Sequence, residues 1–380
     1  MSAFYFLLVH LAVTAALRVA YHLSSREGQE GAVRYSKQAK LILLGAGLIY
    51  VAFSAARLIF HDGIGGNDAL IYKMFFEEAD CSLKEFFSVR TEAVSEPLFR
   101  VLVWSIRQIT AEYRVFLVMV HGIMFLCIAE FNRFCRFRKE NFFTVICTFL
   151  LCGELFYLFC IMRNSLALAF GLWLFALLNE KKYGLALIPL VLAVGMHLAA
   201  VILIPVYVFV LLMDKLRAFT VKKTALWLGV ILALECIALP IFNYLIRNTR
   251  YVYYLGGGIS WGTFAALLVL TVSFFLLYRG RQSSHDDCFE LWAVLCAWVC
   301  LPIQMNYSIF YRSLLMFSPM FYRVIPAVYD RYNALEADKP FKKLIRWGGI
   351  AALAGYVLIR AIKMYTGDFI SYGLYPYMIG

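Results

Sequence analysis

Charged residues are scarce in this chain. Asp, Glu, Lys and Arg make up 16% of its 380 residues, whereas hydrophobic residues make up 63%, which is about 239 residues. Soluble domains contain about 25% charged and roughly 45–50% apolar residues, so a soluble enzyme and a disordered chain are excluded. Because one membrane-spanning helix needs roughly 20 apolar residues, the composition predicts a polytopic, all-α integral membrane protein without a separate soluble domain.

The common signatures of metal, nucleotide and hydrolase sites are also missing. The ten Cys form no CxxC pair, and there is no HExxH, P-loop, Rossmann glycine or Ser-His-Asp pattern. No Asp-x-Asp motif lies in a segment predicted to face outside, and the pair Asp286–Asp287 falls in a predicted inside loop. We therefore expect no metal and no cofactor.

The net charge is positive, because 36 Lys and Arg residues outnumber 24 Asp and Glu residues by 12. In a membrane protein this excess is typical of loops that stay in the cytoplasm, so no nucleic-acid partner is inferred. Six basic clusters recur along the chain, at Arg26–Lys40, Arg133–Lys139, Lys181–Lys182, Lys215–Lys223, Arg279–Arg281 and Arg331–Lys343. The positive-inside rule places all six on the cytoplasmic side.

The spacing of these clusters predicts the topology, since two consecutive inside loops must be separated by an even number of spans. The 31 residues between Lys182 and Asp214 carry no charge. A single helix of that length would measure about 46 Å, against a hydrocarbon core of about 30 Å. We therefore predict a hairpin of two short helices with its outer turn near Gly195–His197.

The same argument, applied to the whole chain, predicts 12 spans in one transmembrane domain, 1–380, with both ends outside. The only long outer segment is 61–112. Within it, the amphipathic stretch Ala69–Glu85 predicts an interfacial helix. The stretch Leu98–Ile109 is short and carries two arginines, which favours a re-entrant or surface-lying helix.

Six ionisable residues fall at the outer turns of this topology: Asp68, Glu96, Arg163, His197, Arg250 and Arg312. Charged groups near spans commonly face a cavity and mark a substrate path. Each residue also has a structural interpretation. The arginines can be interface anchors, the two carboxylates can cap helices, and the histidine can bond a carbonyl in its turn.

The chemistry available to this set is narrow. Arginines bind phosphates through a planar, permanently charged fork, and a carboxylate or imidazole can act as a general base. Outer tyrosines at 251–254 and 372–377 belong to an interface belt or stack on sugar rings. The charges inside predicted spans, Glu154, Glu235 and Arg323, form either buried structural pairs or a second polar path.

Several short motifs, in order along the chain, resemble the EpsG-like branch of the Wzy-type polysaccharide polymerases. They are Gly66–Tyr72 (GNDALIY), Glu96–Phe99 (EPLF), Met162–Ala167 (MRNSLA), Lys182–Gly184, Met196–Ala200 (MHLAA) with Ile204–Tyr207, Tyr251–Tyr254, Tyr311–Arg312 with Phe317 and Ile325–Pro326, and Tyr375–Tyr377. The resemblance covers nearly the whole chain.

The resemblance implies a metal-independent glycosyltransferase of the bacterial cytoplasmic membrane, with its active site facing outside and an architecture of the C-type helical kind. Such enzymes join oligosaccharide repeat units carried on polyprenyl (undecaprenyl) diphosphate into an exopolysaccharide, capsule or O-antigen-like chain. A flippase and a chain-length regulator of the same pathway are the expected partners, beside the lipid bilayer. The alternatives are a transporter of lipid-linked sugars and a polysaccharide ligase.

Within this interpretation, Asp68, Glu96 and His197 are the candidate catalytic residues. One of them removes the proton of the attacking sugar hydroxyl. Asp68 is preferred, because a Gly-rich turn lets the backbone approach a sugar closely.

Arg163, Arg312 and Arg250 are the candidate ligands of the lipid diphosphate. Arg163 and Arg312 lie at outer turns by parity alone, and both also match arginine positions of the resembled family. Tyr72 and Tyr254 are the candidate sugar-binding residues.

Overall fold

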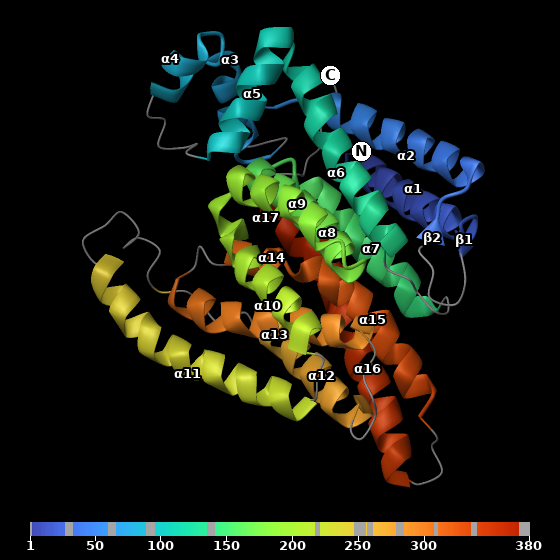
Figure 1. The fold of residues 1–380 in the computed structure, drawn as a ribbon. Helices are drawn as coiled ribbons and strands as arrows, with labels where there is room; N and C mark the ends of the chain where they lie inside the picture. The colour runs from blue at the N-terminus through green and yellow to red at the C-terminus, as the bar shows by residue number, and fades with distance from the viewer. Residues whose placement is uncertain are drawn as a thin grey trace. The chain divides into compact units, whose positions relative to one another are not determined.

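The computed structural model describes residues 2–26, 33–59, 66–88, 96–134, 141–216, 221–246, 256, 261–278, 285–307, 311–335 and 340–371 (Figure 1). Within these ranges the regular secondary structure is helical, apart from an antiparallel ladder of two short strands, β1 (Ser25–Arg26) and β2 (Val33–Arg34). The contacts divide the chain into two compact units, which are described separately. Unit 1 comprises Met1–Arg136, Thr148–Ala200 and Ala361–Gly380, and unit 2 comprises Phe137–Cys147 and Val201–Arg360.

Unit 1 is built on a row of packed helices, in which α1 contacts α2, α2 contacts α6, α6 contacts α8 and α8 contacts α9. Three shorter helices, α3, α4 and α5, pack on one another, and α5 also contacts α9 (Figure 1). The bounds are α1 Ser2–His22, α2 Lys37–Ala55, α3 Ala69–Glu77, α4 Leu83–Ser88, α5 Pro97–Ile109, α6 Tyr113–Phe134, α8 Met162–Asn179 and α9 Tyr183–Met196.

The C-terminal end of the described chain also belongs to unit 1. A π-helical turn, Met364–Asp368, is followed by the short α17 (Phe369–Ser371). Asp368 accepts a hydrogen bond of 2.8 Å from the hydroxyl of Tyr157, at the end of α7 (Phe142–Tyr157), a helix that begins in unit 2. Asn67 donates to the carbonyl of Ser371 at 2.7 Å. The C-terminal turn is therefore held against the segment that precedes α3.

Unit 2 contains the remaining helices, with α13 in contact with α11, α12, α14 and α15. Arg323 lies buried in α15 and pairs with Glu290 of α13 at 3.3 Å. For Arg323 the structure thus supports the interpretation of a buried structural pair. The bounds are α10 Leu203–Leu216, α11 Val221–Ile246, α12 Trp261–Tyr278, α13 His285–Asn306, α14 Tyr311–Leu315, α15 Ser318–Asn333 and α16 Pro340–Lys363, the last of which ends in unit 1; η1 (Leu198–Ile202) lies at the boundary of the units.

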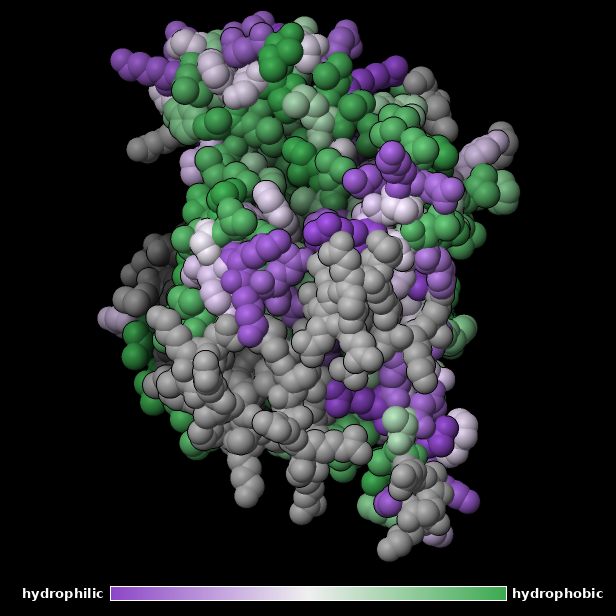
Figure 2. Space-filling model, turned by 45° about the vertical axis from the view of Figure 1, so that its right-hand side comes forward, coloured by the Kyte–Doolittle hydropathy of each residue, from purple (hydrophilic) through white to green (hydrophobic). Residues whose placement is uncertain are grey.

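Six helices in the described parts of the chain are long and apolar enough to cross a membrane: Phe4–His22, Lys37–Ala55, Tyr113–Phe134, Met162–Asn179, Phe289–Asn306 and Pro340–Ser371. Four shorter apolar helices accompany them, at Phe142–Tyr157, Tyr183–Met196, Leu198–Leu212 and Trp261–Leu277. Large apolar side chains also face outward, as on α2, where Leu41, Leu44 and Leu48 are each more than half exposed, and hydrophobic residues cover much of the described surface in Figure 2. The all-helical membrane class is confirmed, while the number of 12 spans stays a prediction.

The observed helix ends test two predictions made from the sequence pattern. The charge-free stretch after Lys182 is interrupted as predicted, because α9 ends at Met196 and His197 is extended. The stretch 69–85 differs from the prediction of one helix, since α3 ends at Glu77 and α4 begins at Leu83. Ser82 and Glu85 form a capping box, in which the Ser82 N–H donates to Glu85 at 2.9 Å and the Glu85 N–H donates to the Ser82 hydroxyl at 3.3 Å.

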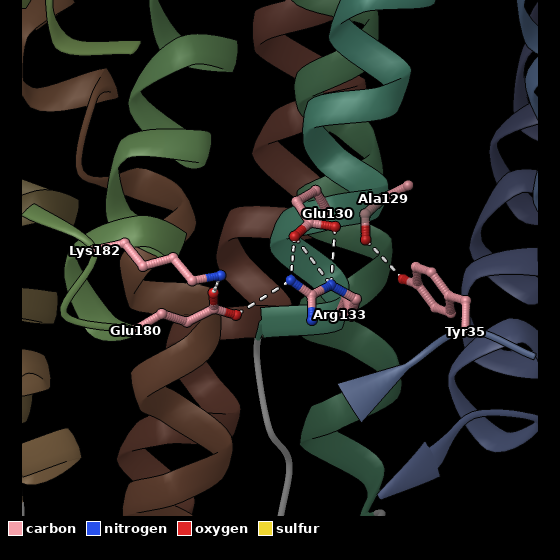
Figure 3. Close-up of polar contacts among 6 residues, drawn as sticks. All are labelled: Tyr35, Ala129, Glu130, Arg133, Glu180 and Lys182. Carbon is pink, nitrogen blue, oxygen red and sulfur yellow. Dashed lines mark hydrogen bonds and ion pairs between the residues drawn. The ribbon is translucent and has the colours of Figure 1, made fainter. Parts of the chain in front are cut away.

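A cluster of ion pairs, which we call the Arg133 cluster, joins the C-terminal ends of α6 and α8 (Figure 3). Arg133 binds both carboxylate oxygens of Glu130 through its Nε, at 3.0 and 2.9 Å, and reaches Glu180 at 3.2 Å. Lys182 completes the cluster with a contact of 2.7 Å to Glu180. Burial by itself would raise the pKa of Glu180, but the hydrogen bond from Lys182 and the charges of Arg133 and Lys182 lower it below its ordinary value.

Candidate substrate site

A second polar cluster gathers at the N-terminal end of α8, and we call it the Arg163 cluster: Asp68, Tyr72, Glu96, Arg163 and His197. At its centre, the guanidinium of Arg163 donates through Nη1 to Glu96 Oε2 in an ion pair. His197 Nε2 lies 3.9 Å from the other oxygen of the same carboxylate. Glu96 thus connects residues that are 67 and 101 positions further along the chain.

Both carboxylates of the cluster occupy the position just before a helix, yet neither caps it. Asp68 precedes α3 and Glu96 precedes α5, and neither side chain accepts a hydrogen bond from the first turn. Helix capping is the structural role expected of such residues. Since neither carboxylate caps its helix, both side chains can take part in the Arg163 cluster.

The hydrogen bonds of His197 define the state of its ring. The backbone N–H of Ala199 donates to His197 Nδ1 at 3.0 Å, so a neutral ring carries its proton on Nε2. That nitrogen is the one beside Glu96. In this arrangement His197 supports the Glu96 carboxylate.

Tyr72 connects the Asp68 turn with Arg163. Its ring, only 4% exposed, has the guanidinium carbon of Arg163 at 6.0 Å from its centroid. Burial raises the pKa of Tyr72, the positive charge of Arg163 opposes that rise, and the negative charge of Asp68 adds to it. The Tyr72 N–H donates to the backbone carbonyl of Asp68 at 3.2 Å. Asp68, Tyr72 and Arg163 therefore lie within electrostatic reach of one another.

Two glycines permit the close approaches that assemble the cluster. A Cβ on Gly66, which has φ +121°, would overlap the backbone carbonyl of Phe159 in the turn before α8. A Cβ on Gly195 would overlap the side chain of Leu98 on α5. The first contact brings the Asp68 turn to the start of α8, and the second brings the end of α9, with His197, to the start of α5.

The burial of the cluster makes its charges costly unless they are paired. Glu96 and His197 are 8% and 7% exposed, and the side chain of Arg163 is 18% exposed. Arg163 stands at the positive end of the α8 dipole, an unfavourable place for a cation, and the adjacent carboxylate offsets this. The buried Arg163 Nε has no hydrogen-bond partner among the described residues. A buried, unmatched donor on a fixed cation is suited to bind an anionic ligand.

Three further predicted residues are not among the described residues of unit 1. Arg312 is in unit 2, on α14, with its Nε 3.4 Å from the Tyr311 hydroxyl. Arg250 and Tyr254 lie outside the described residues. The structure therefore brings together Asp68, Tyr72, Glu96, Arg163 and His197, all within unit 1.

Sequence reasoning missed three polar residues near this cluster. Arg57 follows α2 and is 4% exposed, with its guanidinium carbon 4.3 Å from the centroid of the Phe159 ring. Tyr113 begins α6, and His121 is fully buried about two turns later. The lone arginine at the outer end of the second predicted span was an available signal. The other two residues sit within an apolar helix and offered none.

The fold and this site define a multi-pass helical membrane protein with a buried ionic cluster at one end of its helices. A family model described as the EpsG family matches residues 33–379, so the chain belongs to the EpsG family, as the sequence motifs predicted. The family points to membrane-bound polysaccharide biosynthesis, with glycosyltransferase-like polymerase activity and a lipid-linked substrate. Searches of curated proteins and of solved structures find no significant match.

Proposed function

We propose that this protein polymerises oligosaccharide repeat units linked to polyprenyl diphosphate, on the outer side of the bacterial cytoplasmic membrane. The observation that carries the proposal is the Arg163 cluster, which combines a fixed cation, a carboxylate that makes no helix cap and a buried tyrosine. A glycosyl transfer from a lipid diphosphate needs a cation for the leaving group, a base for the acceptor hydroxyl and a surface for sugar.

In the proposed reaction, a hydroxyl oxygen of the acceptor sugar attacks the anomeric carbon of the donor. The new glycosidic C–O bond forms as the bond between that carbon and the diphosphate oxygen breaks. The hydroxyl proton passes to Asp68, and the bonding pair leaves with the lipid diphosphate. Arg163 stabilises the negative charge that develops on the leaving group, and Glu96 with His197 orients the guanidinium.

The division of labour among the carboxylates follows from their contacts. Glu96 is ion-paired with Arg163 and lies beside His197, so its charge is already balanced. Asp68 is partly exposed at a turn beside Tyr72, where a sugar can reach it. Asp68 is therefore the proposed base, and Glu96 is a positioning residue.

Purified protein incubated with a defined lipid-linked repeat unit tests the proposal directly. A ladder of products that differ by one repeat unit, with release of polyprenyl diphosphate, is the expected result. Movement of the labelled lipid-linked sugar across a vesicle without a ladder would identify a transporter instead. Transfer of a preformed chain to another acceptor, again without a ladder, would identify a ligase.

A further inference from the structure

A buried histidine beside the Arg163 cluster has one nitrogen that the described protein does not use. The Tyr50 hydroxyl lies 2.7 Å from the carbonyl oxygen of Leu155 and 2.6 Å from His121 Nδ1. The phenol has one proton, and a carbonyl can only accept it, so the Nδ1–H of His121 donates to the Tyr50 oxygen. In the neutral ring His121 Nε2 is then a bare acceptor. It is fully buried and has no hydrogen-bond partner among the described residues.

Two further polar groups face the same place. Arg57 lies over the Phe159 ring, and the edge of that ring meets the His121 ring at 5.0 Å between centroids. The charge of Arg57 acts on both Tyr113 and His121. The Tyr113 hydroxyl is buried beside Arg57, whose guanidinium can only donate to it, so the phenol proton has no acceptor in the part of the chain that the structure describes. Arg57 thus lies within electrostatic reach of one hydroxyl donor, Tyr113, and one bare acceptor, His121 Nε2.

This second set adjoins the Arg163 cluster. Tyr113 and Tyr72 interact electrostatically, and Phe159, under Arg57, is the residue whose carbonyl touches Gly66. Each set contains an arginine, a tyrosine and a histidine of unit 1; in the second set Arg57 follows α2, and Tyr113 and His121 both lie on α6. Buried polar atoms without partners are uncommon in native proteins, so a pair of them beside a buried cation is typical of a ligand site.

We propose that Arg57, Tyr113 and His121 form a second binding site, for a phosphate ester that carries a hydroxyl group. The phosphate oxygens accept hydrogen bonds from Arg57 and from the Tyr113 hydroxyl, and the ligand's hydroxyl donates to His121 Nε2. A lipid-linked sugar phosphate and the headgroup of phosphatidylglycerol share this chemistry. The assignment to a second lipid-linked sugar, bound beside the one at Arg163, rests on the proposed function, because polymerisation joins two such molecules.

Native mass spectrometry of the purified full-length protein counts bound ligands without requiring activity. The probe is undecaprenyl diphosphate carrying one N-acetylglucosamine. The wild type is expected to bind two probes, and Arg57→Gln and Arg163→Gln one each. Arg18→Gln is the matched control, since Arg18 is also buried in unit 1, over the Tyr21 ring at 5.0 Å; this variant should still bind two.

A milder variant guards against misfolding. Tyr113→Phe removes only the buried hydroxyl, and it should weaken the second binding event about tenfold, the loss expected for one hydrogen bond to a charged group. Two probes bound to Arg57→Gln, or unchanged affinity in Tyr113→Phe, would overturn the second site. Displacement of the second probe by an equal concentration of phosphatidylglycerol would reassign it to a phospholipid.

The same protein preparation separates this inference from the proposed function. Two bound probes without any ladder from full repeat units would leave the second site standing and refute the polymerase. A ladder with only one bound probe would support the polymerase and refute the second site.

Discussion

The two ends of α8 carry ionic clusters that differ in how completely their charges are matched. At the C-terminal end, the Arg133 cluster pairs two basic with two acidic side chains, and Lys182 is half exposed. At the N-terminal end, the Arg163 cluster is more deeply buried and leaves Arg163 Nε without a partner among the described residues. Exposed, balanced pairs typically contribute about 0–1 kcal/mol and serve to join helices.

The contrast shows how a structural cluster can be told from a binding site of similar composition. Both clusters place a charge against the dipole of α8, with Arg163 at its positive end and Glu180 at its negative end, and both offset it with a partner from another element. Only the Arg163 cluster also holds carboxylates that stand just before a helix without capping it, and a buried donor suited to a ligand. Matched changes at the two sites can therefore separate the two roles.

The largest expected effect is that of Asp68→Asn. This change keeps the shape of the side chain and removes its basicity, so polymerisation by purified protein should slow roughly 10²–10⁴-fold, with binding of the lipid-linked probe retained. Asp80→Asn is the control, because Asp80 pairs with Arg107 at 2.8 Å in the same segment and is 70% exposed. Equal rates for Asp68→Asn and the wild type would show that Asp68 is not the base.

The next effect is that of Arg163→Lys, which keeps the charge and loses the planar fork. We expect polymerisation to fall roughly 10²–10³-fold, the cost of losing one preorganised donor to developing charge, at normal expression. The matched change at the other end of α8 is Arg133→Lys, which should retain near wild-type rates. Similar losses in both variants would mean that both clusters only hold the helices together and that Arg163 has no separate role in the reaction.

Gly66→Ala tests whether the approach of the Asp68 turn to α8 matters for folding. The added methyl group would overlap the Phe159 carbonyl at a φ of +121°, which should cost about 1–3 kcal/mol in the free energy of unfolding and lower the melting temperature. Gly122→Ala on α6 is the control, since nothing lies within 4 Å of its Cβ. If Gly66→Ala left the melting temperature unchanged, this close approach would contribute nothing to stability.

The smallest effect concerns pH at the Arg133 cluster. Because the folded-state pKa of Glu180 is lowered, its ionised form stabilises the fold above the ordinary glutamate pKa of about 4.3. This contribution is lost as the pH falls through the lower, folded value. Glu180→Gln should therefore lower the free energy of unfolding by less than about 1 kcal/mol at pH 7. The melting temperature should fall slightly as a result. The difference in stability from the wild type should vanish in acid. A difference that grows in acid would show that the pKa of Glu180 is raised in the folded protein.

The positions of Arg312, Arg250 and Tyr254 in the site stay predictions. Arg312→Lys in the polymerisation assay tests whether the arginine of α14 shares the leaving-group role with Arg163. A strong loss would place it in the same reaction, and wild-type ladders would leave it as an interface anchor.

Much of the fold was predictable because lipid imposes a simple rule on composition. Long apolar runs without charge predicted helices, and charge parity predicted the helix break at His197. The break between α3 and α4 was missed, because amphipathic spacing over Ala69–Glu85 outweighed a local capping box. Five of the eight predicted site residues meet in unit 1, since helix ends collect the polar residues that lipid rejects.

What the sequence determined by itself is the class of protein, the family and the end of the helices at which the polar residues gather. Only the tertiary structure decided which of them pair. Glu96 meets His197 because Gly195 admits Leu98, and the Asp68 turn reaches α8 because Gly66 admits a carbonyl. Arg57, which follows α2, likewise comes within electrostatic reach of Tyr113 and His121 of α6 only in the folded chain. Hydropathy records how each segment divides between lipid and water, whereas pairing depends on contacts between segments that no local pattern encodes.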